Sequence, residues 1–163
     1  VIMSVTFRLT KHSHALKTSY GAIQDELSAR GQEPSVESIS EAVIAIRQSK
    51  LPDPKVLGNS GSFFKNPALP AQQVAAMAEL HPSVPQYPQA DGTVKVAAGW
   101  LIEQAGWKGK RIGNVGMHAQ QALVLVNYGG ASGPELWEHA LRVQASVEEL
   151  FGVRLEPEVN LIK

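Results

Sequence analysis

The spacing of apolar residues along this chain changes several times between the helical period and strict alternation. One stripe at helical spacing lies near the carboxyl end and consists of Leu136, Ala140, Val143, Val147 and Leu150. Residues 2–9 and 153–162 instead alternate apolar and polar side chains, as half-buried strands do. These changes follow no repeated strand–helix–strand order, which a parallel sheet would require. The pattern therefore predicts an α+β fold.

Capping and helix-breaking residues predict where the other helices begin and end. We expect helices over residues 21–29, 42–49, 71–80 and 96–106, and a longer one after Ser132. Capping boxes of the form S-x-x-E, at residues 38–41 and 132–135, mark two of the helix starts. Prolines at 52 and 54 end the second helix, and Gly106 ends the fourth.

Between these helices the chain offers one further strand and two long connections. Residues 122–128 are almost continuously apolar, which is typical of a buried strand. Residues 81–93 are rich in proline and residues 107–121 are rich in glycine, so both predict irregular loops. Long loops are uncommon inside compact domains and usually have a function, so we expect one for residues 81–93.

Composition excludes several classes of protein. The chain has no cysteine, which rules out disulfides, thiolate metal sites and thiol catalysis. Its 15 basic and 15 acidic residues cancel, so it lacks the positive charge expected of a nucleic-acid-binding protein. No apolar run approaches the roughly 18 residues that cross a membrane. The five histidines do not share a metal-ligand spacing, so we expect no metal site.

The stretch LGNSGSFFKNP, residues 57–67, shows neither a helical nor a strand period. Gly58 and Gly61 could leave backbone N–H groups free for an anion, with Ser62 at an exposed turn. The spacing matches neither a Walker loop nor a G-x-S-x-G nucleophile elbow. The alternative is a turn whose two adjacent phenylalanines are buried in the core, and the stretch alone does not decide between the two.

Three further residues stand out singly, each with an ordinary structural alternative. Glu158 lies on the polar face of the last predicted strand and could equally be a solvated carboxylate. Lys50 could be a helix carboxyl-terminal cation that interacts with the helix dipole. Tyr87, in the proline-rich loop, could belong to a mobile lid or anchor that loop.

Four blocks, taken in order, resemble one family. KLPDPKVLGNSGSFFKNP, YPQADGTVKVAAGWLIEQAG, GNVGMHAQQALVLVN and FGVRLEPEVNLI are similar to successive blocks of UDP-N-acetylenolpyruvoylglucosamine reductase. This family, also called UDP-N-acetylmuramate dehydrogenase, comprises flavoenzymes of bacterial cell-wall precursor synthesis. The resemblance runs over nearly the whole chain and is strongest over residues 50–162.

The resemblance implies how the chain is divided. Residues 1–50 would form the end of a flavin-binding domain. Residues 51–152 would form a substrate-binding domain of mixed helices and mainly antiparallel sheet, and residues 153–163 a return strand that carries Glu158. Most of the FAD site would lie in an amino-terminal half that precedes this segment. The sequence also lacks a starting Met, which predicts that it begins inside a longer protein.

The resemblance further implies a reaction in two steps. NADPH would reduce FAD, and the reduced flavin would then deliver hydride to the enolpyruvyl double bond of UDP-N-acetylglucosamine enolpyruvate, giving UDP-N-acetylmuramate. Ser62 would donate a proton to the inner carbon of that bond. Glu158 would lie against the enolpyruvyl carboxylate. We expect such an enzyme to be cytoplasmic.

Four positions match residues that hold the substrate in the family. Lys50, Asn66 and Gln121 would contact the UDP-sugar, and Tyr87 would cap its diphosphate as part of a lid. Gly61 would let the backbone approach the flavin and the substrate closely.

Three functions remain open at this stage. The chain could be the carboxyl-terminal half of an oxidoreductase, inactive without the flavin-binding half. It could be an isolated module that binds the UDP-sugar without catalysis. It could also be a structural fragment that self-associates through a face that the flavin-binding half would otherwise cover.

Overall fold

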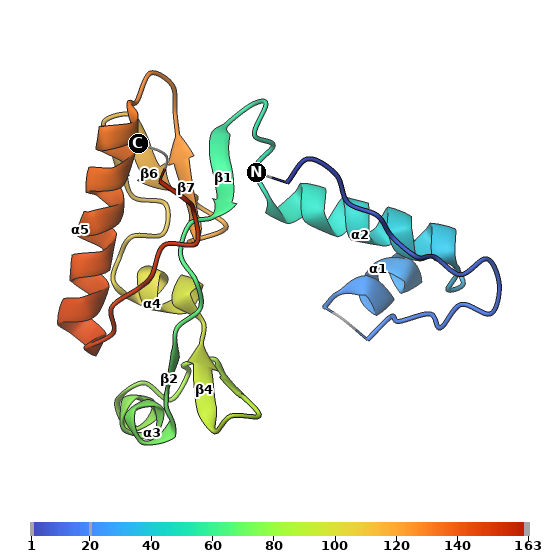
Figure 1. Ribbon diagram of the computed structural model, residues 1–163, viewed down its shortest axis with the longest axis horizontal. Helices are drawn as coiled ribbons and strands as arrows, with labels where there is room; N and C mark the ends of the chain where they lie inside the picture. The colour runs from blue at the N-terminus through green and yellow to red at the C-terminus, as the bar shows by residue number, and fades with distance from the viewer. Residues whose placement is uncertain (1, 20, 162–163) are drawn as a thin grey trace. The chain divides into compact units, whose positions relative to one another are not determined.

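A computed structural model describes residues 2–19 and 21–161 of this chain. The chain divides into two compact units, Val1–Lys50 and Leu51–Lys163, which are coloured blue to cyan and green to red in Figure 1. Each unit has its own buried cluster. No helix in the described part of the chain is long and apolar enough to cross a membrane.

The first unit is a pair of helices, α1 (Ile23–Ala29) and α2 (Val36–Lys50). They pack through a small core of Ile23, Leu27 and Ala42. The helix predicted over residues 21–29 is thereby confirmed, and the second helix ends at Lys50 as expected.

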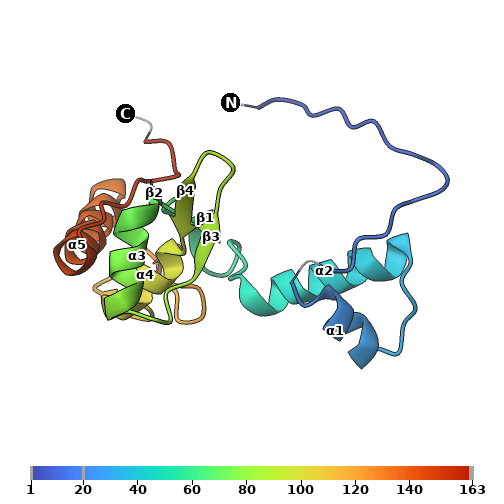
Figure 2. The same cartoon turned by 90° about the horizontal axis from the view of Figure 1, so that it is seen from below.

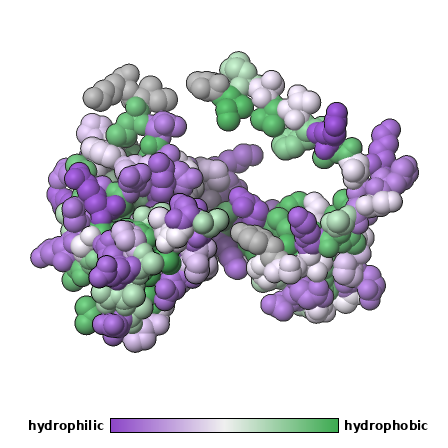
Figure 3. All heavy atoms as spheres, turned by 60° about the horizontal axis from the view of Figure 1, so that its bottom comes forward, coloured by the Kyte–Doolittle hydropathy of each residue, from purple (hydrophilic) through white to green (hydrophobic). Residues whose placement is uncertain are grey.

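The strand predicted over residues 2–9 is wrong. This segment has no regular secondary structure, and its apolar side chains Ile2, Met3, Val5, Phe7 and Leu9 are 63% to 90% exposed. Figure 3 shows green, apolar residues along this extended run of the chain. A strand is held by hydrogen bonds to a neighbouring strand. The described residues of this unit contain no other strand, so the alternating pattern finds nothing to pair with.

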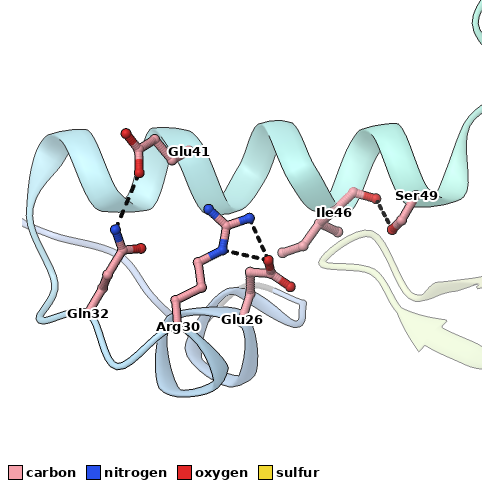
Figure 4. A network of polar contacts seen from close by, with 6 residues as sticks. All are labelled: Glu26, Arg30, Gln32, Glu41, Ile46 and Ser49. Atoms are coloured by element: carbon pink, nitrogen blue, oxygen red, sulfur yellow. Dashed lines mark hydrogen bonds and ion pairs between the residues drawn. The ribbon is translucent and has the colours of Figure 1, made fainter.

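The start of α2 also differs from the prediction. Glu41 lies inside the helix, and the reciprocal cap is formed instead by Ser35 and Ser38. The Ser38 amide donates to Ser35 Oγ at 3.0 Å, and the Ser35 amide donates to Ser38 Oγ at 2.8 Å. Ser38 therefore takes the place that glutamate has in the usual capping box. Glu41 instead accepts a bond from Gln32, as Figure 4 shows.

The described residues of the second unit form two antiparallel sheets. The larger has the strand order β1 (Gly58–Ser62), β7 (Val124–Asn127), β6 (Val115–Met117) and β5 (Arg111–Ile112). The smaller has the order β2 (Ala68–Pro70), β4 (Thr93–Val96) and β3 (Gln86–Pro88). With five helices in the described chain, this arrangement confirms the predicted α+β fold with mainly antiparallel strands.

Three helices complete the second unit: α3 (Ala71–Leu80), α4 (Ala98–Gln104) and α5 (Gly133–Phe151). Helix α5 runs along the larger sheet, where it contacts β6 and β7 (Figure 1). Helix α3 contacts β2 and β4 of the smaller sheet (Figure 2). One core joins these layers, and its fully buried side chains include Leu101, Ile102, Met117, Val143 and Leu155.

Helix predictions in this unit hold better than loop predictions. The helix over residues 71–80 and the stop at Gly106, with φ of 75°, are confirmed. Both predicted loops are partly wrong, because residues 81–93 contain β3 and residues 107–121 contain β5 and β6. These strands are only two or three residues long, too short for an alternating pattern to show.

The predicted apolar face of α5 and the strand predicted near the carboxyl end are each only partly correct. In α5, Leu150 is exposed, and Phe151 packs on the core in its place because it lies four residues after Val147. The strand predicted over residues 153–162 is reduced to one isolated bridge, between Pro157 and Phe64. Ile162 lies outside the described residues.

Candidate functional site

Strand β1 carries most of the motif that the sequence singles out, and it pairs with β7 through an irregular register. Asn59 lies opposite Val126 and Ser62 lies opposite Val124, with a register shift between them. Such a shift is a β-bulge, in which one strand carries an extra residue. Gly61 lies in the bulge with φ of 78°, a conformation that side chains disfavour. The stretch is therefore a bulged strand, where the sequence predicts a turn.

Gly61 has no free amide for an anion, contrary to the sequence-based hypothesis. Its N–H donates to Asn59 Oδ1 at 3.0 Å. A Cβ added at Gly61 would meet no atom within 4 Å, so the surface beside it is open. Glycine is required here for its positive φ, and a flat group could approach the open backbone closely.

Ser62 and Glu158 are brought close in the fold although 96 positions separate their numbers. The Glu158 amide donates to the carbonyl of Phe63 at 2.8 Å, and the Lys65 amide donates to the carbonyl of Glu156 at 2.9 Å. On the other side, the Phe63 amide donates to the carbonyl of Leu123 at 2.8 Å. The chain after Ser62 therefore lies between β7 and the carboxyl-terminal segment, and both Ser62 and Glu158 are exposed.

Two phenylalanines anchor this segment in the core. Phe63 is 7% exposed and Phe64 is 1% exposed, and their rings meet edge to face at 5.2 Å. The core reading of the phenylalanine pair is thus confirmed. Of the other alternative, the exposed Ser62 is found, whereas the free amide at Gly61 is not.

Asn66 connects the motif to helix α4. Its Oδ1 accepts a bond from the Ala98 amide at 2.9 Å, at the first residue of that helix. This bond uses the amide oxygen, and the amide nitrogen is the atom that can donate to a ligand. Asn66 also lines a hollow of about 430 Å³ together with Lys65, Arg154 and Glu156. Lys65 pairs with Glu156 at 3.6 Å, an exposed contact that contributes little to stability.

Tyr87 lies in a hairpin where the sequence predicts an irregular loop. It sits on β3, opposite Lys95 of β4, and its side chain is 54% exposed. Asp91 holds the turn between these strands, because its Oδ1 accepts bonds from the amide and the hydroxyl of Thr93, at 3.0 and 2.7 Å. The hydroxyl bond keeps the pKa of Asp91 below its ordinary value.

Lys95 is a residue that the sequence reading missed. In register it lies between Ala68 of β2 and Tyr87 of β3, so it and Tyr87 point to the same face of the small sheet. The available signal was a single cation within the otherwise uncharged strand TVKV, next to a helix.

Gln121 lies in the loop that leads into β7. Its backbone carbonyl accepts a bond from the Val124 amide at 2.9 Å, and its backbone N–H donates to His118 Nδ1 at 3.2 Å. Because Val124 lies opposite Ser62, this loop and the bulge share one end of the larger sheet. Lys50 is the exposed last residue of α2 in the other unit, so the structure does not group it with these residues.

Comparisons with known proteins agree on one family. The model for the carboxyl-terminal domain of UDP-N-acetylenolpyruvoylglucosamine reductase matches residues 53–162. A protein of that name from Chromobacterium violaceum is 57% identical over 159 residues, covering 97% of this chain and 46% of the relative. Relatives of the same name from Pseudomonas fluorescens and Flavobacterium johnsoniae are each 53% identical, covering 99% of this chain and 48% of their own length.

The chain spans about half the length of the curated relatives that it matches. The family match covers two thirds of the chain and includes the bulged strand, the hairpin with Tyr87 and the segment with Glu158. This chain therefore belongs to the UDP-N-acetylenolpyruvoylglucosamine reductase family, and its residues 53–162 correspond to the carboxyl-terminal domain of that family.

Proposed function

We propose that this chain supplies the substrate-binding half of a reductase that converts UDP-N-acetylglucosamine enolpyruvate to UDP-N-acetylmuramate. The observation that carries the proposal is the backbone pairing that brings Ser62 and Glu158, far apart in the sequence, to neighbouring segments of the chain. Residues 1–50 and 153–163 would belong with an amino-terminal flavin-binding half, and residues 51–152 would bind the UDP-sugar.

The cofactor would be FAD, held mostly by that amino-terminal half. When bound, FAD supplies the hydride that it receives from NADPH. The open backbone at Gly61, where even a Cβ would touch nothing, is compatible with a flat ring lying close to the chain. Gly61 is the one residue of this chain that we assign to the flavin.

Ser62 would supply the proton that completes the reduction. Addition of hydride to the outer carbon leaves negative charge next to a carboxylate, and the inner carbon must then receive a proton from a positioned donor. The exposed hydroxyl of Ser62 follows an anchored bulge, so its position is set by the chain on both sides. Glu158 would contact the enolpyruvyl carboxylate, which requires a shared proton or a cation between the two groups.

Other residues would hold the remainder of the substrate. Tyr87 and Lys95 lie opposite each other on neighbouring strands, so a hydroxyl and an ammonium group could together bind the diphosphate. The amide nitrogen of Asn66 and the side chain of Gln121 would donate to the sugar. Lys50 would act as a further point charge on an anionic oxygen.

A second candidate is a module that binds the UDP-sugar without catalysis. The unit Leu51–Lys163 has its own core and contains every assigned residue except Lys50, which favours independent binding. The two candidates differ only in whether a flavin-binding half acts with this chain.

A fusion protein tests the proposal. We would join the amino-terminal part of the Chromobacterium violaceum relative to this chain and follow oxidation of NADPH that depends on the UDP-sugar. The parent fusion should turn over. Ser62→Ala should lower kcat by about 10²- to 10⁴-fold, the range that a general acid contributes.

Ser60→Ala is the matched control for this test. Ser60 is an exposed serine on the same strand, two residues before Ser62, and its loss should leave kcat unchanged. Full turnover by Ser62→Ala would rule out the proton-donor role. A parent fusion that binds the UDP-sugar but never oxidises NADPH would favour the binding module.

A further inference from the structure

Asn59 makes hydrogen bonds within the motif through both ends of its side-chain amide. Its Nδ2 donates to the carbonyl of Leu57 at 2.8 Å and to the carbonyl of Pro52 at 3.2 Å. Its Oδ1 accepts from the Gly61 amide at 3.0 Å. An amide side chain has two N–H donors and one carbonyl oxygen, so each group of Asn59 is engaged. The side chain is half-buried, which makes these bonds less replaceable by water.

The carbonyls that Asn59 binds belong to a turn with its own internal bonds. The Lys55 amide donates to Asp53 Oδ1 at 2.9 Å, and the Leu57 amide donates to the carbonyl of Asp53 at 2.8 Å. Two prolines, at 52 and 54, restrict the backbone further. Asn59 therefore links a stiffened turn on one side to the bulge on the other.

The bulge determines which way Ser62 faces. Side chains alternate between the two faces of a strand, so a slip of one residue moves each side chain to the opposite face. The extra residue between Asn59 and Ser62 sets the register in which Ser62 lies opposite Val124. Without the extra residue, Ser62 would move one position along, to the place next to Leu123 that Phe63 now occupies.

Gly61 makes the bulge possible, but glycine alone does not specify it. Glycine adopts positive and negative φ about equally well, so residues 60–62 could also form a regular strand. The bond from the Gly61 amide to Asn59 Oδ1 selects the conformation with φ of 78°. The selection depends on an acceptor at residue 59, and the position of that acceptor depends on the two carbonyls that hold the amide nitrogen.

We propose that Asn59 is a positioning residue for proton transfer by Ser62. It holds the Gly61 bulge in the register that presents the Ser62 hydroxyl at the surface. This inference rests on the proposed function, since it assigns Asn59 a role in the step that Ser62 performs.

Asn59→Ala and Asn59→Asp in the fusion protein test this role. Alanine removes all three bonds, whereas aspartate keeps an acceptor for the Gly61 amide but loses both donors. Both should lower kcat while leaving the KM for the UDP-sugar nearly unchanged, and alanine should have the larger effect. A misplaced catalytic group of this kind costs on the order of 10²-fold in rate.

A double-mutant cycle separates positioning from general damage. If Asn59 acts through Ser62, then adding Asn59→Ala to Ser62→Ala should cause no further loss of kcat. Asn127→Ala is the matched control, because Asn127 also binds a turn with both ends of its amide, on the neighbouring strand β7. It should lower stability without lowering kcat.

Amide hydrogen exchange gives a readout that does not depend on turnover. In the chain itself, Asn59→Ala should speed exchange at the Gly61 amide, because its acceptor is lost. Unchanged exchange there, full kcat in both Asn59 variants, or additive losses with Ser62→Ala would each overturn the inference alone. A parent fusion without turnover would overturn the proposed function, and the catalytic role of Asn59 with it.

Discussion

Ser62 is exposed, yet the residues directly after it are among the most buried in the chain. Phe63 and Phe64 lie in the core. The Phe63 amide donates to the carbonyl of Leu123, just before β7, and the Phe63 carbonyl accepts a bond from the carboxyl-terminal segment. The motif thus combines a fixed backbone with an accessible hydroxyl. The sequence could predict the buried phenylalanines from their apolarity. It could not predict the bulge, because the pairing with Val124 and Val126 is a long-range contact.

His139 has a titratable side chain that is almost fully buried and lies outside the proposed site. It is 5% exposed, its ring meets Trp107 edge to face at 5.1 Å, and its Nε2 has no hydrogen-bond partner among the described residues. Burial lowers the pKa of His139 below its ordinary value of 6.5, and the positive charges of Arg142 and Lys110 lower it further. The folded chain therefore favours the neutral ring.

This burial predicts that stability depends on pH. Because the pKa of His139 is lower in the folded chain than in the unfolded chain, the unfolded state binds the proton first as pH falls. His139 therefore leaves the free energy of unfolding unchanged above its ordinary pKa of 6.5, and the free energy of unfolding falls progressively as the pH drops below that value. Urea unfolding between about pH 7.5 and 5.5 should show His139→Gln losing less stability over this range than the parent chain.

The same substitution at an exposed histidine provides the control for this prediction. His12 lies in the amino-terminal segment and is exposed, so His12→Gln should leave the dependence of stability on pH as it is in the parent. Equal slopes for His139→Gln and the parent would show that burial of His139 does not drive the effect.

Helix α5 is the element that the sequence predicts best. The Ser132 amide donates to Glu135 Oε2 at 2.8 Å, and Ser132 Oγ receives the Glu135 amide at 3.4 Å, so the predicted capping box is formed. Bonds from the hydroxyl and amide of Ser132 keep the pKa of Glu135 below its ordinary value. Gly152, with φ of 62°, ends the helix. Each of these signals is local, which is why the sequence shows them.

The cap predicts a graded effect of substitution at Ser132. Ser132→Ala removes the acceptor for the Glu135 amide and should lower the free energy of unfolding by about 1 kcal/mol. Ser132→Gly should lower the free energy of unfolding by only a few tenths of a kcal/mol, roughly the cost of glycine at other helix N-caps. Chemical denaturation of both variants measures this, and an alanine variant as stable as the glycine variant would contradict it.

Other elements could not be predicted because their stability comes from pairing with a neighbouring strand. The alternating residues 2–9 have the pattern of a strand but no neighbour in the described unit. Conversely, β3, β5 and β6 have almost no pattern, but each pairs with a neighbouring strand. At this scale hydrogen-bond partners decide the outcome, and local propensity does not.

For the whole molecule, the resemblance predicted more of the candidate site than the residue patterns did. Ser62, Asn66, Tyr87, Gln121 and Glu158 all lie in the second unit, and pairing of Phe63 with Glu158 brings two of them together. Asn59 and Lys95 became candidates only from the structure, since the roles proposed for them depend on a bulge and on strand register. No pattern in one sequence reports such contacts.

The division into two units bears on how the chain would work. The second unit holds one continuous core and all but one of the assigned residues, whereas the first has a small core of three buried side chains. We therefore expect this chain to recognise the UDP-sugar without the flavin-binding half, and catalysis to require that half as well.

Calorimetric titration of this chain with UDP-N-acetylglucosamine enolpyruvate tests that claim most directly. We expect one-to-one binding, and Tyr87→Ala should weaken it because the Tyr87 hydroxyl is proposed to bind the diphosphate. Tyr87 is exposed, so its loss should leave the fold intact. Leu80→Ala, at a still more exposed position on α3, should bind as the parent does. A folded chain that gives no heat of binding, or Tyr87→Ala binding as tightly as the parent, would contradict the claim that this half carries the substrate site.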